Sequence, residues 1–344
     1  MSLPRPPTSS LAALVWLLGA CATAQLAPYT EARTAMGTRF SITVYAPDHE
    51  TARDGLEAAF ARIESLDARL SDYDPHSELS RLSLAPVGEA VAVSEDLWRV
   101  LTEAERVHAL SGGAFDVSVG ALSRLWRSAR RHGSLPDPER LERALAATGA
   151  HLLTLDPTSR AVRLHAEGMR LDLGGIAKGF ALDEALAALR SRGLPRAMVD
   201  GGGDLLLGQP PPRRAAWRVA VETGAEAGSA RVRLELANAA VATSGDGFRH
   251  AVIDGVRISH VIDPRTGAGL TDSPVSTVVA PSGMLADAWA SALCVLGPTR
   301  GLKVLESLPD VEARLVCGKG ARARSFESAG FPAAVVSSPP DGRP

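Results

Sequence analysis

Several short stretches of this chain carry polar residues at spacings suited to phosphate chemistry. In the segment 171–179, a strand-like run meets Gly174 and Gly175 and then a helix with Lys178 in its first turn. Free N–H groups at a helix N-terminus favour an anion, glycines let a phosphate approach the backbone, and a lysine adds positive charge. The stretch predicts a pyrophosphate site, although a tight turn followed by a solvated lysine has the same pattern.

A second candidate is the pair Asp287 and Ser291, which lie four residues apart. A helix would place both side-chain oxygens on one face. Mg²⁺ prefers hard oxygen ligands, takes few of them from the protein, and completes its shell with water and substrate phosphates. The pair therefore predicts a Mg²⁺ site, against the alternative of an ordinary pair on a helix surface.

A third candidate is His260, in a segment 258–267 that ends a strand in an Asp-Pro turn. Histidine is the natural base for deprotonating a hydroxyl nucleophile near neutral pH. The alternative is a buried strand histidine, with Asp263 capping the turn.

Further candidates are residue types that can hold a flat ring system. Met36 and Tyr73 could sandwich such a ring, and Phe115-Asp116 follows a glycine pair that permits close approach. Each of them is also typical of a core or a turn. The segment 201–204 predicts a bulge or a close backbone contact, and 243–246 predicts a turn near the same site.

The elements that must position these residues can be read from the spacing of apolar residues. Alternation over residues 40–44 predicts a half-buried strand. Helical spacing predicts helices over 56–70, 97–110, about 177–192 and 285–296, with another near Lys303, and many strands follow one another up to residue 280. Because helices and strands mix without regular alternation, the pattern favours one compact α+β protein in two lobes.

Composition bounds the possible function classes. The 344 residues are 45% hydrophobic and 22% charged with a formal net charge of -2, so a large core is possible and no general attraction to nucleic acid is expected. The three cysteines are too few for a disulfide scaffold. The core must hold the fold, and any phosphate chemistry must rest on local groups.

The N-terminal residues 1–20 have the layout of a secretory signal. Cys21 directly follows the apolar run and predicts a lipidated first residue, whereas cleavage after Ala24 is the alternative. Either reading places the mature protein outside the cytoplasm, and lipidation would anchor it facing the periplasm, on the inner membrane rather than the outer. Residues 21–33 are predicted as a leader and 331–344 as a loose tail.

Taken together, eight segments in order resemble the ApbE family of FAD:protein FMN transferases, and the likeness covers roughly residues 34–330. The segments are MGTRFSITVYA, LSDYDPHSELSRLS, GGAFDVSVGAL, LDLGGIAKGFALDEA, VDGGGDLLL, VATSGD, SHVIDPRTG and ADAWASA. The resemblance implies a T-fold-like α+β protein, with largely antiparallel sheets flanked by helices, that binds FAD as substrate across the lobes. It also implies Mg²⁺ at the pyrophosphate, transfer of FMN to a threonine or serine hydroxyl, and release of AMP.

The resemblance also implies roles for individual residues. The positions that match FAD contacts of the family are Met36, Tyr73, Ala114, Phe115, Asp116, Asp172, Lys178 and the backbone near Ile262. The positions that match its metal ligands are Gly175 (through its carbonyl), Asp287 and Ser291. The chain departs from the family at Ser291, where many relatives have threonine, at Ala290, where some have an acidic residue, and at Gly174, which replaces a frequent serine.

The partners implied are FAD and an acceptor flavoprotein, such as a redox-pump subunit or an extracytoplasmic flavoprotein, with a membrane reached only through the lipid. Two other functions use the same residues. An FAD pyrophosphatase would release FMN and AMP, and a flavin-binding lipoprotein would hold FAD without turnover. A metal ligand pair and a base favour catalysis over storage.

Overall fold

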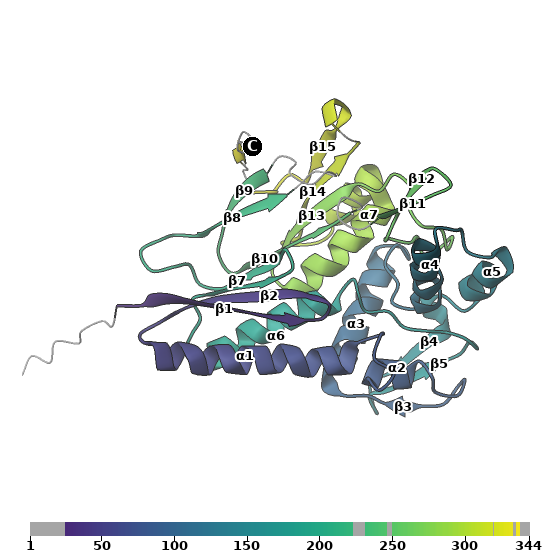
Figure 1. Ribbon diagram of the computed structural model, residues 1–344, viewed down its shortest axis with the longest axis horizontal. Coiled ribbons are helices and arrows are strands. Elements are labelled where there is room, and N and C mark those ends of the chain that lie inside the picture. The colour runs from purple at the N-terminus through teal and green to yellow at the C-terminus, as the bar shows by residue number, and fades with distance from the viewer. Residues whose placement is uncertain (1–24, 223–230, 246–249, 319, 333–334, 338–344) are drawn as a thin grey trace, which may run out of the picture.

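The structure is a computed structural model that describes residues 25–222, 231–245, 250–318, 320–332 and 335–337. Its largest sheet has eight strands, each antiparallel to its neighbours, in the order β1-β2-β6-β7-β10-β13-β14-β15 (Figure 1). The strands are β1 (Ala27–Ala35), β2 (Thr38–Ala46), β6 (Ala197–Gly201), β7 (Asp204–Leu207), β10 (Ala239–Ser244), β13 (Val275–Ala280), β14 (Glu312–Cys317) and β15 (Arg324–Glu327).

Three long helices pack on one face of this sheet and enclose the main core. They are α1 (His49–Leu70), α6 (Ala177–Ser191) and α7 (Gly283–Leu305). Figure 1 shows α1 and α6 running side by side below the sheet, with α7 rising behind it. Trp289, Phe40 and Phe180 are among the largest fully buried side chains of this core. Long apolar helices on an alternating sheet are the two-layer arrangement that the sequence pattern predicts.

The opposite face of the sheet is covered by a smaller antiparallel sheet. This sheet has the order β16-β9-β8, with β8 (Trp217–Glu222), β9 (Arg231–Leu236) and β16 (Val335–Ser337). Leu207 and Val241 of the large sheet pack against Trp217 and Leu234 of the small one, and Phe331 joins the same cluster. The large sheet is therefore buried on both faces at its centre.

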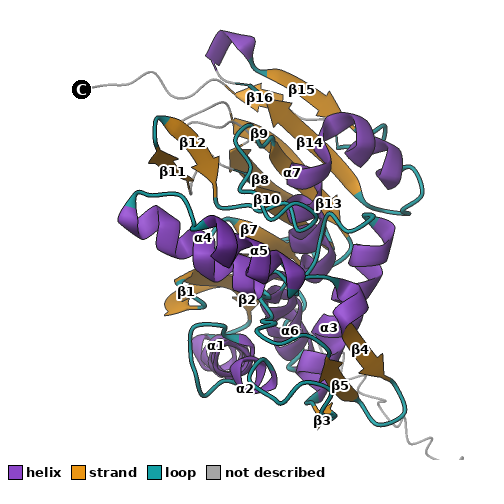
Figure 2. Ribbon diagram, turned by 90° about the vertical axis from the view of Figure 1, so that its right-hand side faces the viewer, coloured by secondary structure: helices purple, strands orange, loops and turns teal. Residues whose placement is uncertain are grey.

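The second lobe lies at one end of the molecule, on the right in Figure 1. It contains α2 (Glu78–Leu82), α3 (Glu95–Leu110), α4 (Gly120–His132), α5 (Pro138–Ala146), a short 3₁₀ helix (Ala150–Leu152) and the sheet of β3 (Val91–Ala92), β4 (Leu153–Asp156) and β5 (Ala161–Leu164). The hairpin of β11 (His250–Ile253) and β12 (Val256–Ser259) packs on α4 through Ile253, Ile258 and Trp126. Figure 2 shows this hairpin beside α4.

The predicted α+β class, with two lobes and largely antiparallel sheets, is confirmed. The predicted helices are also present as α1, α3, α6 and α7, and their starts follow from local chemistry. Asp48 caps α1 by accepting a hydrogen bond from Thr51 N at 2.8 Å. The two predicted C-terminal helices form one element, α7, with a break at Gly297 (φ 68°) before Pro298. A last 3₁₀ helix covers Gly320–Arg322.

The structure differs from the predicted boundaries at both ends of the domain. Part of the predicted leader, residues 27–33, belongs to β1, which pairs with β2 across a turn at Met36 (φ 49°) and Gly37 (φ 68°). Two left-handed residues are what a tight hairpin requires, and β1 reads as polar because it is an edge strand. In the predicted tail, Phe331 is buried and residues 335–337 pair with β9.

Within the described part of the chain, no helix combines the length and apolar character needed to cross a bilayer. Cys21 and the predicted signal segment 1–20 lie outside the described residues. Their roles stay predictions.

Candidate functional site

The first turn of α6 and the first turns of α7 meet at a cluster of buried charges. Lys178 pairs with Asp204 at the start of β7, and its Nζ lies 3.4 Å from Oδ1 of Asp287 on α7. The other oxygen of Asp287 accepts a hydrogen bond from Gly179 N at 3.0 Å. Asp204 is held in turn by the backbone of β10, because its Oδ1 accepts from Thr243 N at 3.1 Å. The helices α6 and α7 and the strands β7 and β10 thus meet around Lys178.

The surroundings of the cluster favour the charged form of Lys178 and disfavour the charged form of Asp287. Burial raises the pKa of Asp287 to about 6, although Lys178 and the N–H of Gly179 act in the opposite direction. For Lys178, burial alone would lower the pKa, but the carboxylates of Asp287 and Asp204 outweigh burial and the net shift is upward. One cation between two carboxylates leaves the cluster one negative charge in excess at neutral pH.

The predicted metal ligands lie together. A Cβ built on Gly175 would stand 3.1 Å from Oγ of Ser291 and 3.2 Å from the Phe115 ring, so the loop before α6 runs directly against α7. Ser291 Oγ also lies 3.3 Å from Ser244 Oγ at the end of β10. A side chain at position 175 would be in tight contact with Ser291 and Phe115 and would take up space in front of the Ser291 hydroxyl.

The donor set of this place fits Mg²⁺. A backbone carbonyl at Gly175, a carboxylate at Asp287 and a hydroxyl at Ser291 are hard oxygen ligands, as Mg²⁺ prefers. Among the described residues no group of three or more His, Cys, Asp or Glu side chains could form a protein-only metal site. An ion held here would therefore rely on water and on phosphate oxygens of a substrate, which is the usual pattern for Mg²⁺.

The segment 112–120 lies beside the segment 170–175 that precedes α6. Asp172 N donates to Val117 O at 2.8 Å, and Val119 and Arg170 form a parallel bridge. Ala114 and Phe115 are buried, and Phe115 contacts the loop at Gly175. Two of the predicted FAD-binding segments are thus neighbours, although they lie some distance apart in sequence.

Asp116 is buried and fully engaged. Its Oδ1 accepts from Ser118 N at 2.8 Å and from Ser118 Oγ at 2.6 Å, and its Oδ2 lies 3.3 Å from Nδ1 of His108. Burial would raise the pKa of Asp116, but the hydrogen bonds of His108 and Ser118 outweigh it and the net shift is downward. The Asp116 carboxylate therefore stays ionised and orients His108, whose pKa the same contact raises.

Tyr73 and Asp172 are joined by an arginine. The guanidinium of Arg127 on α4 lies 4.4 Å from the centre of the Tyr73 ring, and it donates to Asp172 Oδ2 at 2.7 Å and to Asp72. Asp172 also accepts from Gly174 N at 2.8 Å. Tyr73 is 76% exposed, so one face of its ring rests on Arg127 while the ring remains open to a ligand.

Met36 occupies the β1–β2 turn, where its N–H donates to Asp67 Oδ2 at 2.7 Å. The next turn along the sheet is Gly202-Gly203, and a Cβ on Gly202 would overlap Thr38. The segment 201–204, predicted as a bulge or a close backbone contact, is a hairpin turn between β6 and β7, and its backbone lies against the Thr38 side chain. Met36 is half-buried against the main core.

His260 and Ile262 lie in the loop after β12. Ser259 N donates to Leu270 O at 2.7 Å, and Ile262 bridges to Gly269, so this loop folds back on itself. Arg265 at its tip packs against Gly113 of the 112–116 segment. The loop therefore reaches the predicted FAD-binding segments and carries His260 with it. Its role as a base stays a prediction.

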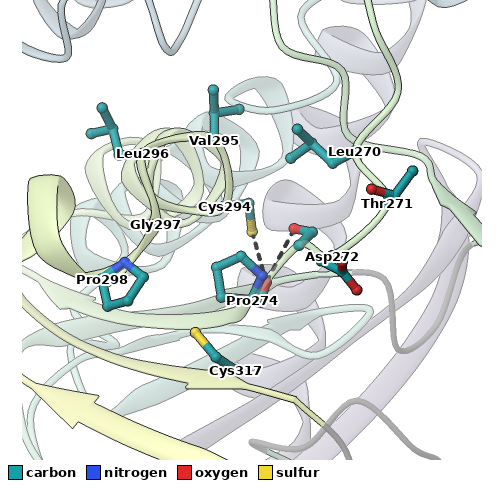
Figure 3. A pocket seen from close by; sticks show the side chains of 11 residues that line it. Leu270, Thr271, Asp272, Pro274, Cys294, Val295, Leu296, Gly297, Pro298 and Cys317 are labelled. Atoms are coloured by element: carbon teal, nitrogen blue, oxygen red, sulfur yellow. Dashed lines mark hydrogen bonds between the residues drawn. The ribbon is translucent and has the colours of Figure 1, made fainter.

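A cavity of about 270 Å³ lies one helical turn beyond Ser291. Figure 3 shows Cys294 of α7 and Cys317 of β14 on either side of Pro274, with the Cys294 thiol donating to Pro274 O at 3.4 Å. None of the predicted FAD or metal residues lines this cavity. The predicted residues Lys178, Asp287 and Ser291 lie instead at the charged cluster and beside the loop at Gly175.

Sequence reasoning missed three residues that the structure places at the site. The sequence marks Asp204 only as part of a glycine-rich turn, whereas in the structure it pairs with Lys178. Arg127 and His108 lie on helices without a recognisable motif, and each contacts a predicted FAD-binding residue. Nothing in the sequence marked Arg127, and the pairing of Asp204 with Lys178 depends on how the strands and helices meet.

Comparisons with known proteins agree on one family. A family model described as the ApbE family matches residues 36–315 of the chain. The chain is 34% identical over 277 residues to the FAD:protein FMN transferase of Vibrio cholerae, covering 79% of this chain and 82% of that protein. Among solved structures, the flavin transferase ApbE of Vibrio cholerae has a TM-score of 0.80 at 30% identity, covering 89% of this chain and 98% of that one. The ApbE protein of Thermotoga maritima has a TM-score of 0.79 at 30% identity, covering 88% and 97%.

Proposed function

The chain belongs to the ApbE family, and on that premise we propose that it is an FAD:protein FMN transferase, which moves FMN from FAD to a hydroxyl of another protein. The observation that carries the proposal is the meeting of Lys178, Asp287 and Ser291 with the loop at Gly175. This meeting provides the glycine-rich start of a helix, a cation and an oxygen donor set in one place. A dinucleotide diphosphate needs these three features together.

The start of α6 suits a diphosphate for a local reason. Ile176 at its N-cap supplies no side-chain hydrogen bond, and Lys178 lies in the first turn beside Gly174 and Gly175, so the positive end of the helix dipole and the lysine charge act at the same place. Tyr73, Met36 and Phe115 would hold the flavin or adenine rings, with Arg127 supporting Tyr73 from behind. Asp172 would accept hydrogen bonds from the polar groups of FAD, and Asp116 would act beside them by orienting His108.

In the reaction, a threonine or serine Oγ of the acceptor attacks the phosphorus of the FMN half of FAD. The bond from that phosphorus to the bridging oxygen breaks, AMP leaves with the bridging oxygen, and the hydroxyl proton passes to His260. Lys178 faces the charge that develops on the leaving phosphate. Mg²⁺ held by Gly175, Asp287 and Ser291 would neutralise diphosphate charge.

The test is incubation with FAD, Mg²⁺ and a flavin-acceptor domain. Transfer predicts covalent flavin fluorescence on the acceptor together with an equal amount of AMP. AMP without labelling would mean an FAD pyrophosphatase, and tightly held FAD with no AMP would mean a storage protein. Either result contradicts the proposal. EDTA should abolish both products if Mg²⁺ takes part.

A His260→Ala variant tests the base. Loss of the proton acceptor should lower the rate of FMN transfer by about 100-fold or more at pH 7, because general base catalysis contributes that much. FAD affinity, followed by flavin fluorescence, should change little. A variant that keeps the wild-type rate with FAD bound would remove His260 from the mechanism.

We also propose that the protein is exported and anchored by lipid at Cys21, facing the periplasm. The support is the apolar run that ends directly before the only cysteine of the N-terminal segment. Cys21→Ala should release the protein from membranes into the soluble periplasmic fraction. Membrane retention of this variant, or cleavage after Ala24 in the wild type shown by mass spectrometry, would contradict lipidation.

A further inference from the structure

The helices α6 and α7 carry the same short motif at their starts. Each has a glycine followed four residues later by an aspartate: Gly179 and Asp183 on α6, and Gly283 and Asp287 on α7. Asp287 belongs to the predicted metal site. Asp183 has no part in the function argued so far.

The two aspartates make reciprocal contacts. Asp287 of α7 accepts a hydrogen bond from Gly179 N of α6 at 3.0 Å. Asp183 of α6 accepts from Gly283 N at 2.6 Å and from Met284 N at 2.9 Å, both on α7. Each helix therefore binds the N–H group of the other helix's glycine through its own carboxylate.

The glycines allow this exchange because the backbones touch. A Cβ on Gly179 would stand 2.1 Å from Gly283 O, and a Cβ on Gly283 would stand 2.4 Å from Gly179 O. Both distances are far shorter than any side-chain contact, so the crossing point admits glycine only. The position of α7 along α6 is thus fixed within a fraction of a turn.

Asp183 adds to the cap of α7 from another helix. Ser282 is the N-cap residue of α7, and its Oγ accepts a hydrogen bond from Leu285 N at 3.3 Å. Asp183 comes from a different helix, and burial raises its pKa to about 6, so its carboxylate is ionised at neutral pH at a cost in desolvation. Asp183 thus binds the two N–H groups that Ser282 does not reach, and because it comes from α6 it ties the start of α7 to that helix.

We propose that Asp183 is a positioning residue for the metal site: by binding Gly283 N and Met284 N, it holds α7 against α6 so that Asp287 faces Gly179 and Lys178. The inference rests on the proposed function, because the value of this position is that it presents Asp287 and Ser291 to the diphosphate site. Loss of Asp183 should misplace both ligands without removing either.

Asp183→Asn tests the proposal with little change in shape. Asparagine offers one acceptor oxygen where Asp183 uses two, and its NH₂ group would face one of the two N–H donors. The matched control is Ser282→Ala, which weakens the cap of α7 but leaves the contact with α6 intact. Mn²⁺ serves as the probe, with free Mn²⁺ counted by electron paramagnetic resonance in the presence of FAD and without acceptor.

In Asp183→Asn we expect Mn²⁺ to bind at least about 10-fold more weakly, as for other residues that orient metal ligands. Hydrogen exchange should rise in both 177–182 and 283–288, because the two contacts depend on each other. Ser282→Ala should keep the Mn²⁺ affinity within about two-fold and raise exchange only at the start of α7.

Unchanged Mn²⁺ affinity in folded Asp183→Asn would overturn the proposal, as would equal weakening in Ser282→Ala. If Asp183→Asn does not fold, Asp183→Ser, which keeps one acceptor and adds no opposing donor pair, takes its place with the same expected results. Wild-type protein that binds FAD and Mn²⁺ but transfers no FMN would refute the proposed function, and the comparison of variants would still decide the role of Asp183.

Discussion

Lys178 shows how single residues set the chemistry of this site. It lies between Asp204 and Asp287, which leaves an excess of one negative charge in a buried place. Such a cluster is costly unless a further cation binds, and a divalent ion with a diphosphate satisfies both the carboxylate and the lysine. The residues explain why the ion and the dinucleotide should bind together.

Removal of the Arg127 side chain should change how the stability of the protein depends on pH. Its guanidinium lies between Asp72 and Asp172. The pKa of Asp72 is raised even with the arginine present, mainly by burial and next by the negative charge of Asp172. In Arg127→Ala both carboxylates lose their partner, so the pKa of Asp72 should rise further. When the pKa of a carboxyl group is higher in the folded than in the unfolded state, the folded protein loses stability as the pH rises from the unfolded pKa through the folded one.

The melting temperature of Arg127→Ala should therefore fall increasingly below that of the wild type as the pH rises above the ordinary pKa of an aspartate, about 4. The KM for FAD should rise about 10-fold, because Tyr73 loses the support of the guanidinium. The neighbouring exposed Arg131→Ala is the control. A difference in melting temperature that does not change with pH would contradict this account.

At the scale of elements, the crossing of α6 and α7 positions the site. Gly179→Ala would place a methyl group against the carbonyl of Gly283. This carbonyl belongs to the backbone of α7 and cannot rotate away as a side chain could. We expect a loss of about 3 kcal/mol or more in the free energy of unfolding. Chemical denaturation measures it, and FMN transfer should fall with it.

Gly193→Ala, just after α6, is the matched control. It has a positive φ of 75° but open space around its Cα, so only backbone strain of about 1 kcal/mol is expected and transfer should persist. Equal effects of the two substitutions would show that the close approach of the helices is unimportant.

At the scale of the whole molecule, the two faces of the large sheet have different tasks. One face carries α6 and α7 and thereby the site, while the other is covered by β8, β9, β16 and Phe331. The far face should therefore affect stability without affecting chemistry.

Phe331→Ala tests this separation. Removing a buried phenylalanine should cost about 3 kcal/mol in the free energy of unfolding. The rate of FMN transfer at 25 °C should stay within about two-fold of the wild type. A large fall in rate with the protein still folded would mean that the two faces are coupled.

The sequence by itself determined the α+β class, the four long helices and the glycine-rich entry to α6, because these depend on local spacing and on turn chemistry. It also marked Gly175, Lys178, Asp287 and Ser291 as candidates. Strand β1 escaped prediction because an edge strand carries polar residues on both sides.

Only the tertiary structure decided which charges meet. Asp204, Arg127 and Asp183 gain their partners from segments far away in the chain, and local sequence contains no information about a contact that depends on how helices cross. Nothing in the sequence distinguishes Gly179 and Gly283 from other glycines; the need for glycine follows from the crossing, which places the two backbones in contact. Close packing brings these residues together, and it depends on the whole core at once. The sequence alone could therefore identify them only as candidates.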